Sequence, residues 1–494
     1  MTGSLASPLE APPTTTRLLR ATSRRVAAAG RERTLALTAL AVIAMHMLDD
    51  NFLQPEAGTS AAHHLVSGLV PFAALLASAT AYPRLRAGLR AAIAIPLGAL
   101  SIVAGVGEAG YYSLQVGPSG DDYTGLLAIP AGLLLVGLGA TTLWRSRRTN
   151  DRLIRRYVRR LSKAAVAVVA GYVVLFPFAL SYVFTHSARA AVPKAELGAA
   201  YQNVSFTTSD GLTLKGWYVP SRNRAAVIAA PGRAGSQKQA RMLARHGYGV
   251  LLFDRRGEGA SEGDPNAFGW AADKDLNAAV AYLQHRRDVD GNRIGGIGLS
   301  VGGETLLQTA AESDGLKAVV ADGAGSRSLR EDLARSGTNK WGEIPTSLVI
   351  TAGTMLFANQ AAPPLLKNLV GRIAPRPVFF IYGEHDQDNV RELAHGYYAA
   401  AGEPKQLWQV AGASHTGGID VRPSEYEQRV TAFFDRALLT NERRGGKRGQ
   451  RRDAAGTTAR SCIVPGGTEA KSTCKRLRTR SSRPSGRLLS LLDR

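Results

Sequence analysis

Cysteine is almost absent from this chain, which contains two cysteines among 494 residues. Both of them, Cys462 and Cys474, lie near the C-terminus. A disulfide framework therefore cannot support the folded part of the chain, and no cluster of cysteines offers a metal site. A bridge between these two residues would close only a loop in the C-terminal tail.

Acidic residues are also scarce, at 39 Asp and Glu against 61 Lys and Arg, which leaves a formal net charge of +22. The positive excess lies in residues 1–190 and 441–494, whereas residues 191–440 are nearly neutral. Because the basic residues of both flanks fall between apolar runs or in a tail, nucleic-acid binding is disfavoured. The length of the chain predicts roughly two to four structural units.

Long apolar runs dominate the N-terminal third. Residues 1–33 are rich in Pro, Thr, Ser and Arg, which predicts a disordered basic leader. Residues 34–186 contain five apolar stretches that mostly approach the ~20 residues a bilayer requires, which predicts a membrane region of about five helices. These stretches are Thr34–Leu48, Leu65–Tyr82, Ala91–Tyr112, Leu126–Trp144 and Ala164–Phe184. A signal peptide is the rival interpretation of the first stretch, but no small-x-small cleavage site follows it.

The loops between the apolar stretches differ in charge. Residues 82–90 and 145–163 are rich in arginine, whereas residues 49–64 and 112–124 carry acids and neither Lys nor Arg. Arginine-rich loops remain in the cytoplasm, so the four loops alternate as five spans require. The pattern predicts an integral membrane protein whose C-terminal part is extracytoplasmic.

Several His and Asp residues lie in or beside the first acidic loop, namely His46, Asp49, Asp50, His63 and His64. His and carboxylate groups bind metals. No spacing here is diagnostic of a metal site, so a polar interfacial loop is the preferred interpretation and no metal is predicted. The spans show neither buried charges in series nor an inverted repeat, which disfavours a transport role.

From Tyr201 the pattern changes to short apolar runs that alternate with helical stretches. Residues 204–220 indicate two strands joined by a hairpin turn at Ser209-Asp210-Gly211. Further strands are predicted at 225–232, 248–254, 293–300, 317–322, 377–383 and 405–412. Strands that are hydrophobic throughout and alternate with helices predict a mostly parallel sheet covered on both faces. Catalytic groups in such folds collect at the carboxyl ends of the strands.

Three of these strand ends carry residues of serine-hydrolase type. Ser300 lies in Gly298-Leu299-Ser300-Val301-Gly302, which fits the strained G-x-S-x-G turn between a strand and a helix. Asp386 ends GEHD and His415 ends GASH, each just after a strand. A serine hydroxyl is a weak nucleophile until an imidazole takes its proton, and a carboxylate orients that imidazole. The rivals are Asp388 and Asp322 for the acid, and the less favoured His385 and His395 for the base.

The order Ser300, Asp386, His415 along the chain resembles the α/β hydrolase family. FDRRGEGAS, Phe253–Ser261, is similar to that family's D-x-R-G-x-G-x-S segment, and APGRAG, Ala230–Gly235, lies where the family carries H-G-x-x-G. The resemblance implies an α/β hydrolase domain over residues 195–440 that needs no cofactor. It also implies an oxyanion hole formed by the backbone N–H groups of Val301 and Arg233, although Pro231 stands where histidine is usual.

Two further segments complete the predicted organisation. Residues 326–370 lie where family members often carry a cap over the nucleophile. The apolar side chains of this segment are therefore expected to line an acyl pocket. These side chains are Trp341, Leu348, Met355, Leu356 and Phe357. Residues 441–494 are basic and rich in Gly, Ser and Thr, which predicts a disordered tail that anionic lipid or wall polymer would attract.

The sequence therefore predicts a membrane-anchored serine hydrolase that cleaves a carboxylic ester, thioester or amide through an acyl-enzyme. The expected substrate is a small-molecule or lipid-like acyl compound. Acyl transfer to an envelope acceptor is the alternative within the enzyme class, and a non-catalytic binding or signalling module is the alternative outside it. The residues leave the substrate and the oligomeric state open.

Overall fold

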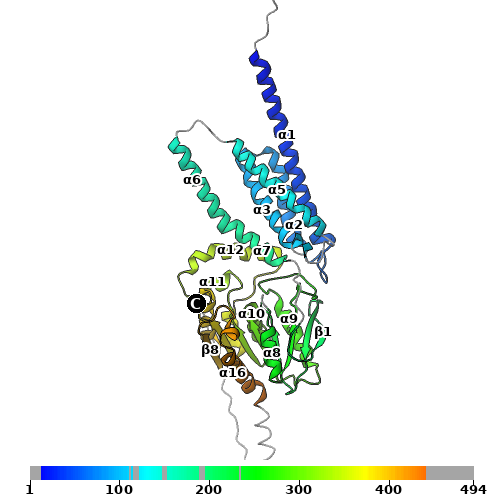
Figure 1. The fold of residues 1–494 in the computed structure, drawn as a ribbon, viewed down its shortest axis with the longest axis vertical. Helices are drawn as coiled ribbons and strands as arrows, with labels where there is room; N and C mark the ends of the chain where they lie inside the picture. The colour runs from blue at the N-terminus through cyan, green and yellow to red at the C-terminus, as the bar shows by residue number, and fades with distance from the viewer. Residues whose placement is uncertain are drawn as a thin grey trace, which may run out of the picture. The chain divides into compact units, whose positions relative to one another are not determined.

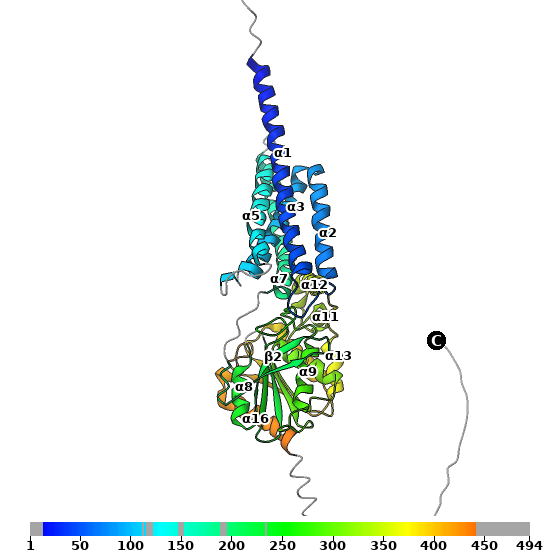
Figure 2. The same cartoon turned by 90° about the vertical axis from the view of Figure 1, so that its right-hand side faces the viewer.

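The computed structural model describes residues 13–110, 113–114, 122–146, 153–187, 195–232 and 235–440. These residues form an N-terminal helical region and a region built on one eight-stranded sheet (Figures 1 and 2). The predicted tail over 441–494, with both cysteines, lies outside the described residues, and so does the first part of the predicted leader, 1–12.

The helical region consists of long apolar helices, several of which continue into a short π or 3₁₀ turn. Its elements are α1 (Pro13–Leu48), η1 (Asp49–Leu53), α2 (Leu65–Ala81), η2 (Tyr82–Arg84), α3 (Ala87–Ala104), η3 (Gly105–Gly110), α5 (Asp122–Arg145), α6 (Leu153–Ala170), η4 (Gly171–Leu175) and α7 (Phe176–Thr185). Within the described ranges, five segments are long and apolar enough to cross a membrane: Gly30–Leu53, Leu65–Arg84, Ala87–Gly107, Tyr123–Arg145 and Ile154–Thr185. Each of them overlaps one of the five apolar stretches identified in the sequence.

Helix α1 begins earlier than the sequence pattern indicates. It starts at Pro13, so much of the segment assigned to a disordered leader is helical. The residues after Pro13 include many Leu, Arg and Ala, which are strong helix formers, and proline is well tolerated in the first turn of a helix. Low hydrophobicity alone was therefore a poor guide to disorder in this segment.

Helices α3 and α5 approach each other closely because small residues face each other. A Cβ atom at Gly98 would lie 2.6 Å from the carbonyl oxygen of Gly132, and one at Gly132 would lie 2.5 Å from that of Gly98. The Ser101 hydroxyl donates a hydrogen bond of 2.7 Å to the Ala128 carbonyl across the same pair of helices. Small residues allow this kind of backbone approach between apolar helices.

Polar residues near the end of α1, and in the loop before α2, make hydrogen bonds. Thr124 on α5 donates to Asp49 Oδ2 at 2.7 Å, and its hydroxyl lies 3.3 Å from His46 Nδ1. His64 Nε2 lies 3.1 Å from the Thr59 hydroxyl. Across the described part of the chain, no group of three or more His, Cys, Asp or Glu residues is placed to hold a metal ion.

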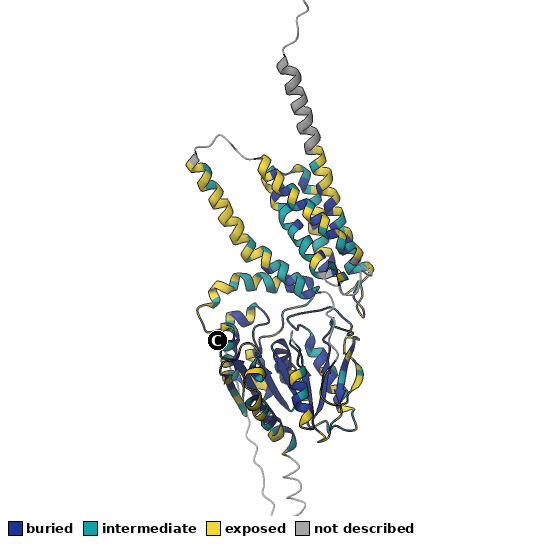
Figure 3. Ribbon diagram, viewed as in Figure 1, coloured by how far each residue is buried: buried dark blue, intermediate teal, exposed yellow. Residues whose placement is uncertain are grey.

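The sheet has the strand order β1-β2-β4-β3-β5-β6-β7-β8, and β1 and β8 lie at its opposite edges (Figure 1). Strand β2 pairs antiparallel with β1 and with β4, and the remaining pairs are parallel. The strands are β1 (Gln202–Thr207), β2 (Thr213–Val219), β3 (Ala226–Ala230), β4 (Gly249–Phe253), β5 (Ile294–Leu299), β6 (Ala318–Asp322), β7 (Val378–Gly383) and β8 (Lys405–Val410). All residues of the five strands β3 to β7 are buried, as continuous hydrophobic runs predict for a central parallel sheet (Figure 3).

Helices cover both faces of the sheet. They are α8 (Gln237–Arg245), α9 (Ala272–Gln284), α10 (Val301–Glu312), α13 (Leu366–Leu369), η5 (Val370–Ile373), α14 (Asp388–Ala400), α15 (Gly418–Val421), α16 (Pro423–Phe434) and η6 (Asp435–Leu439). Residues of α9, α10, α13 and α14 share one apolar core with the sheet, and residues of α8 and α16 share the other. This arrangement confirms the predicted fold class.

An insertion between β6 and β7 carries α11 (Leu329–Ala334) and α12 (Lys340–Phe357). Helix α12 packs against α7 of the helical region. The Phe357 ring lies 5.0 Å from the Phe178 ring and 5.2 Å from the Tyr182 ring, measured between centroids. The apolar side of the insertion is therefore used, at least at this end, for packing on a helix that is distant in sequence.

Candidate active site

Ser300 occupies a sharp turn between β5 and α10. Its backbone has φ 51° and ψ −122°, a conformation that L-residues rarely adopt. The flanking glycines are required by contact. A Cβ at Gly298 would lie 2.3 Å from the Gly302 carbonyl oxygen, and a Cβ at Gly302 would lie 2.5 Å from that of Ala230. The G-x-S-x-G pattern thus corresponds to a strained strand-to-helix turn with Ser300 at its apex.

Hydrogen bonds hold the turn against the next strand. The Ser300 N–H donates to the Asp322 carbonyl at 2.7 Å, and the Ser300 carbonyl accepts from the Gly303 N–H at 2.8 Å. Val301 is the first residue of α10, where backbone N–H groups have no acceptor within the helix. Its amide is therefore of the kind that can bind an oxyanion.

The second predicted oxyanion donor, Arg233, lies outside the described residues. The adjacent Gly232 is described, and it lies directly beside the nucleophile turn. A Cβ at Gly232 would lie 2.6 Å from the Leu299 carbonyl oxygen and 3.4 Å from Ser300 Cβ. The loop after β3 therefore passes along the Ser300 turn at the position where the sequence predicts the oxyanion loop.

Asp386 and His415 follow neighbouring strands and contact each other. His415 Nδ1 lies 2.8 Å from Asp386 Oδ1. An ionised carboxylate can only accept, so Nδ1 carries the hydrogen and Nε2 is left as the proton acceptor. Asp386 is buried and also accepts a hydrogen bond of 3.0 Å from the Gln387 N–H. The hydrogen bond to Asp386 raises the pKa of His415 above its ordinary value.

The rival residues have other partners. Asp322 is 1% exposed, accepts a hydrogen bond of 2.8 Å from the Tyr426 hydroxyl, and has its pKa raised to about 6 by burial. Asp388 begins α14 and pairs with Arg391. His395 Nε2 lies 2.9 Å from the Tyr382 hydroxyl.

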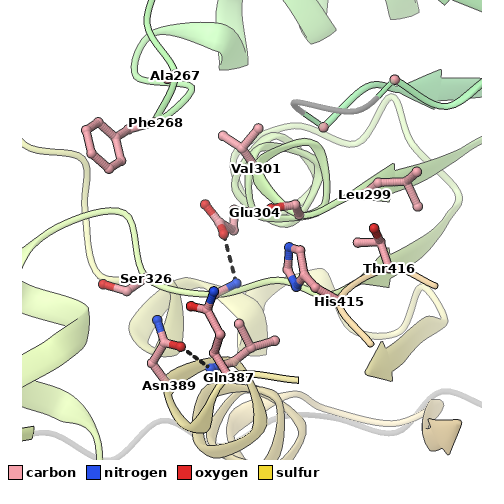
Figure 4. A pocket seen from close by; sticks show the side chains of 16 residues that line it. Ala267, Phe268, Leu299, Val301, Glu304, Ser326, Gln387, Asn389, His415 and Thr416 are labelled. Atoms are coloured by element: carbon pink, nitrogen blue, oxygen red, sulfur yellow. Dashed lines mark hydrogen bonds between the residues drawn. The ribbon is translucent and has the colours of Figure 1, made fainter. Parts of the chain in front are cut away.

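Ser300 and His415 line one cavity of about 290 Å³ (Figure 4). Leu299, Val301, Gly232 and Gly323 belong to the same wall. Several polar or aromatic members of this wall were not predicted from the sequence, namely Phe268, Glu304, Ser326, Gln387 and Asn389. Proximity in sequence could have indicated some of them, because Gln387 directly follows the predicted acid, Asn389 lies three residues after it, and Glu304 lies one helical turn after Ser300.

Glu304 is the buried acid of this wall. It is 5% exposed, and its Oε1 accepts a hydrogen bond of 2.8 Å from the Gly325 N–H. Figure 4 shows Glu304, His415 and Gln387 around the same space. The Glu304 carboxylate adds to the negative charge that favours the protonated form of His415, which contributes to the raised pKa of that histidine.

The apolar residues of the insertion do not line the cavity beside Ser300, so the prediction that they form an acyl pocket is wrong. Leu356 and Phe357 line a different cavity, among the helices of the N-terminal region, and Phe357 packs on α7. Trp341, Leu348 and Met355 are exposed. Of the five predicted pocket residues, only Leu356 and Phe357 line a cavity, and that cavity lies among helices that are remote in sequence rather than over Ser300.

The Arg-rich turn after β4 is built around ion pairs. Arg256 Nη2 lies 2.6 Å from Asp275 Oδ1, and Arg256 Nη1 lies 3.0 Å from Asp210 Oδ2. Lys274 also pairs with Asp210, at 3.0 Å. Since the Arg256 and Asp275 side chains are almost fully buried, this network ties the turn to α9 and to the β1–β2 hairpin.

Comparison with known proteins gives the same family as the site. Residues 201–421 match the model of the X-Pro dipeptidyl-peptidase (S15 family). The chain is 30% identical to the Mycobacterium tuberculosis protein Rv2307c, over 56% of this chain and 93% of that protein. It is 27% identical to the polyketide transferase grgF of Penicillium, over 43% of this chain and 88% of that protein.

Among solved structures, the Pyrococcus furiosus esterase Pf2001 is 25% identical, with a TM-score of 0.42, and the match covers 51% of this chain and 97% of the esterase. The family match spans the sheet, the turn at Ser300 and the strand ends that carry Asp386 and His415. The resemblance identified from the sequence motifs is thereby confirmed, and the chain belongs to the α/β hydrolase superfamily.

Proposed function

We propose that this protein is a membrane-anchored serine hydrolase that cleaves a carboxylic ester, or a thioester or amide, through an acyl-enzyme. One observation carries the proposal. The hydrogen bond of 2.8 Å between His415 and Asp386 lies at the cavity that Ser300 also lines. Serine, imidazole and buried carboxylate together are what nucleophilic acyl chemistry requires.

In the proposed reaction, the Ser300 hydroxyl oxygen bonds to the carbonyl carbon while His415 Nε2 takes its proton. The tetrahedral intermediate then collapses, and the bond between the carbonyl carbon and the oxygen of the leaving alcohol breaks. The His415 imidazolium gives its proton to the oxygen of that alcohol. Water then attacks the acyl-enzyme by the same route, with His415 as base, which releases the acid and restores the Ser300 hydroxyl. Asp386 orients His415 and stabilises its charged form in both halves.

The negative oxygen of the intermediate needs hydrogen-bond donors. We assign the Val301 N–H as one donor, because it lies next to the nucleophile at the start of α10. The Arg233 N–H remains the proposed second donor by resemblance to the family. Each such donor contributes about 3–4 kcal/mol to the transition state in a site that excludes water.

The test is labelling of the full chain with a fluorophosphonate probe, which reacts with activated serines. Wild-type protein is expected to be labelled, and Ser300→Ala is expected to lose the label. Ser205→Ala, an exposed serine on β1, is the matched control and should label like wild type. Equal labelling of Ser300→Ala and wild type, or no labelling of either, would sink the enzyme proposal in favour of a binding or signalling module.

Acyl transfer is the second candidate, and one comparison favours it. A polyketide transferase is among the similar proteins, and the acyl-enzyme of a hydrolase can pass its acyl group to an alcohol instead of water. Product analysis with and without added alcohol acceptors separates the two reactions. An ester product that rises with the acceptor at the expense of free acid would favour transfer.

We further propose that the five apolar helices anchor the chain with the hydrolase region outside the cytoplasm. The support is the alternation of arginine-rich and acidic loops between segments long enough to span a membrane. A reporter that is active only in the cytoplasm, fused after Leu439, should be silent. An active reporter would show that the proposed orientation is wrong, and the proposed chemistry would be unaffected.

A further inference from the structure

A second cavity, of about 210 Å³, lies among the helices of the N-terminal region. Helices α1, α2, α3 and α7 contribute most of its wall. The turn η1, Ala128 of α5, and Leu356 and Phe357 of α12 supply the rest. These N-terminal helices, α5 included, belong to segments long and apolar enough to cross a membrane. In a bilayer, such segments are surrounded by hydrocarbon rather than by water.

Most of the cavity wall is apolar. Aliphatic side chains such as Ile43, Leu75 and Leu97 line it, together with the aromatic cluster of Phe178, Tyr182 and Phe357. Tyr182 also stacks on His186, with ring centroids 4.3 Å apart. Such a wall offers dispersion contacts over an extended surface, which suits a hydrocarbon chain.

Polar residues enter the wall where α1 ends and α2 begins. The Ser67 hydroxyl donates to Asn51 Oδ1 at 3.1 Å, and Asn51 Nδ2 donates to Asp50 Oδ2 at 2.8 Å. Asn51 and Ser67 are each 3% exposed, and His46 lies in the same part of the wall. A cavity that is apolar along most of its length and polar where two helices meet their loop matches an amphiphile with a hydrocarbon chain and a polar head.

The outer surface of α2 is apolar, like the cavity wall. Val70 belongs to the wall, and Leu69 and Leu76 on the same helix are exposed. On α12, Met355 is exposed beside Leu356, which lines the cavity. Exposed apolar side chains on a membrane-spanning helix contact lipid chains, so a lipid can reach the elements that build the cavity.

The last turn of α7 contacts both cavities. Tyr182 and His186 line the helical cavity. Phe184, between them in sequence, packs edge-on against Phe268, with ring centroids 5.2 Å apart, and its carbonyl accepts a hydrogen bond of 2.9 Å from the Ala267 N–H. Phe268 and Ala267 line the cavity beside Ser300. One helical turn therefore connects the apolar cavity with the candidate active site.

From these contacts we infer that the helical cavity binds a hydrocarbon chain of a bilayer lipid, with the polar head toward Asn51 and Ser67. We assign that lipid as an ester substrate, so the substrate class of the enzyme is a long-chain membrane lipid ester. The substrate assignment rests on the proposed hydrolase function, whereas the lipid-binding site does not.

The binding test uses the full chain carrying Ser300→Ala, in nanodiscs that contain a phosphatidylcholine with a diazirine on its acyl chain. After illumination, cross-linked peptides are identified by mass spectrometry. Cross-links are expected on α2, α7 and α12 at residues of the cavity wall. Adding Ala74→Phe, which places a ring at the cavity wall, should remove most of them.

Ala77→Phe is the matched control. Ala77 is exposed and lies one turn further along the same helix, and it is not among the described residues that line the cavity. It should leave the cavity cross-links unchanged. Cross-links that persist in Ala74→Phe as strongly as in Ala77→Phe, or that fall only on outward-facing residues, would overturn the lipid site.

The substrate test compares hydrolysis of short-chain and long-chain nitrophenyl esters by otherwise wild-type protein. Ala74→Phe should lower kcat/KM for the palmitate ester by about tenfold or more and leave the acetate ester nearly unchanged, since the lost contacts are those of the long chain. Ala77→Phe should affect neither ester. An unchanged palmitate rate in a variant that has lost its cross-links would assign the cavity to a resident lipid and overturn the substrate assignment.

The two proposals fail in different ways. If the hydrolase proposal is wrong, Ser300-dependent labelling is absent and the cross-links in the cavity remain. If the lipid-site proposal is wrong, labelling and acetate hydrolysis are normal, and Ala74→Phe does not change the cross-links.

Discussion

The Tyr426 hydroxyl donates a hydrogen bond of 2.8 Å to Asp322 Oδ2, and this contact distinguishes Asp322 from Asp386, the predicted acid partner of His415. Asp322 is held by Tyr426 of α16, whereas Asp386 is held by His415 itself. Burial raises the pKa of Asp322 to about 6, which makes its charged form costly without a cationic partner in contact. The surroundings therefore favour Asp386 as the group that orients His415.

Substitution at these two carboxyls should have unequal effects on catalysis. Asp386→Asn is expected to lower kcat by about 10⁴-fold, because the amide stabilises the wrong tautomer of His415 and does not stabilise the imidazolium. Asp322→Asn keeps an acceptor for Tyr426 and should cost much less in kcat. Steady-state hydrolysis of a nitrophenyl ester measures both, and a larger loss in Asp322→Asn would exchange their roles.

Activity should depend on pH through His415. Because the pKa of His415 is raised, the neutral, base-competent form predominates only at a pH above the ordinary histidine pKa of 6.5. We expect kcat/KM to be low in acid and to rise with pH to a plateau, with a midpoint above 6.5. Glu304→Gln removes one of the charges that favour the protonated form and should shift the midpoint downward. A midpoint below 6.5 in wild-type protein would contradict the assignment.

The glycines of the nucleophile turn should tolerate no side chain. In Gly302→Ala the new methyl would lie 2.5 Å from the Ala230 carbonyl oxygen and 2.9 Å from that of Pro231, so the backbone must shift. We expect this variant to lose fluorophosphonate labelling even where it still folds by circular dichroism. Gly291→Ala serves as the comparison, because a Cβ at Gly291 would lie at ordinary contact distance, 3.6 Å, from Gln284 Cγ, and this variant should label normally.

The buried ion pair between Arg256 and Asp275 should matter for stability. Arg256→Ala leaves Asp275, 1% exposed in its side chain, without its cation, which is expected to cost about 3–5 kcal/mol. Lys238→Ala breaks an exposed pair with Asp420 and should cost less than about 1 kcal/mol. The unfolding midpoints of the full chain in detergent measure the difference, and similar midpoints for the two variants would show that the buried network is dispensable.

Much of the hydrolase region was predictable from local patterns. The strands β3 to β7 are continuous apolar runs, and each was predicted to within a few residues because a sheet buried on both faces admits few polar side chains. The turn at Ser300 was predictable because the positions of Gly298 and Gly302 are set by backbone contacts within a few residues.

The insertion shows where local patterns fail. The apolar side of α12 has the same periodicity whether it covers Ser300 or packs on another helix, so periodicity cannot select the partner. The partners of Phe357 are Phe178 and Tyr182, which are remote in sequence. The polar wall of the Ser300 cavity was missed for a similar reason, because Glu304 and Asn389 come from helices that meet only in the folded chain.

The contact between Phe184 and Phe268 bears on how the hydrolase region should be produced without the N-terminal helices. A fragment that starts after residue 187 lacks both the ring that packs on Phe268 and the carbonyl that accepts from Ala267. One wall of the cavity beside Ser300 would then lose its support, even with Ser300, His415 and Asp386 unchanged. Substrate preferences measured on such a fragment would describe a reshaped pocket, so a usable fragment should retain α7 or replace the Phe184 contact.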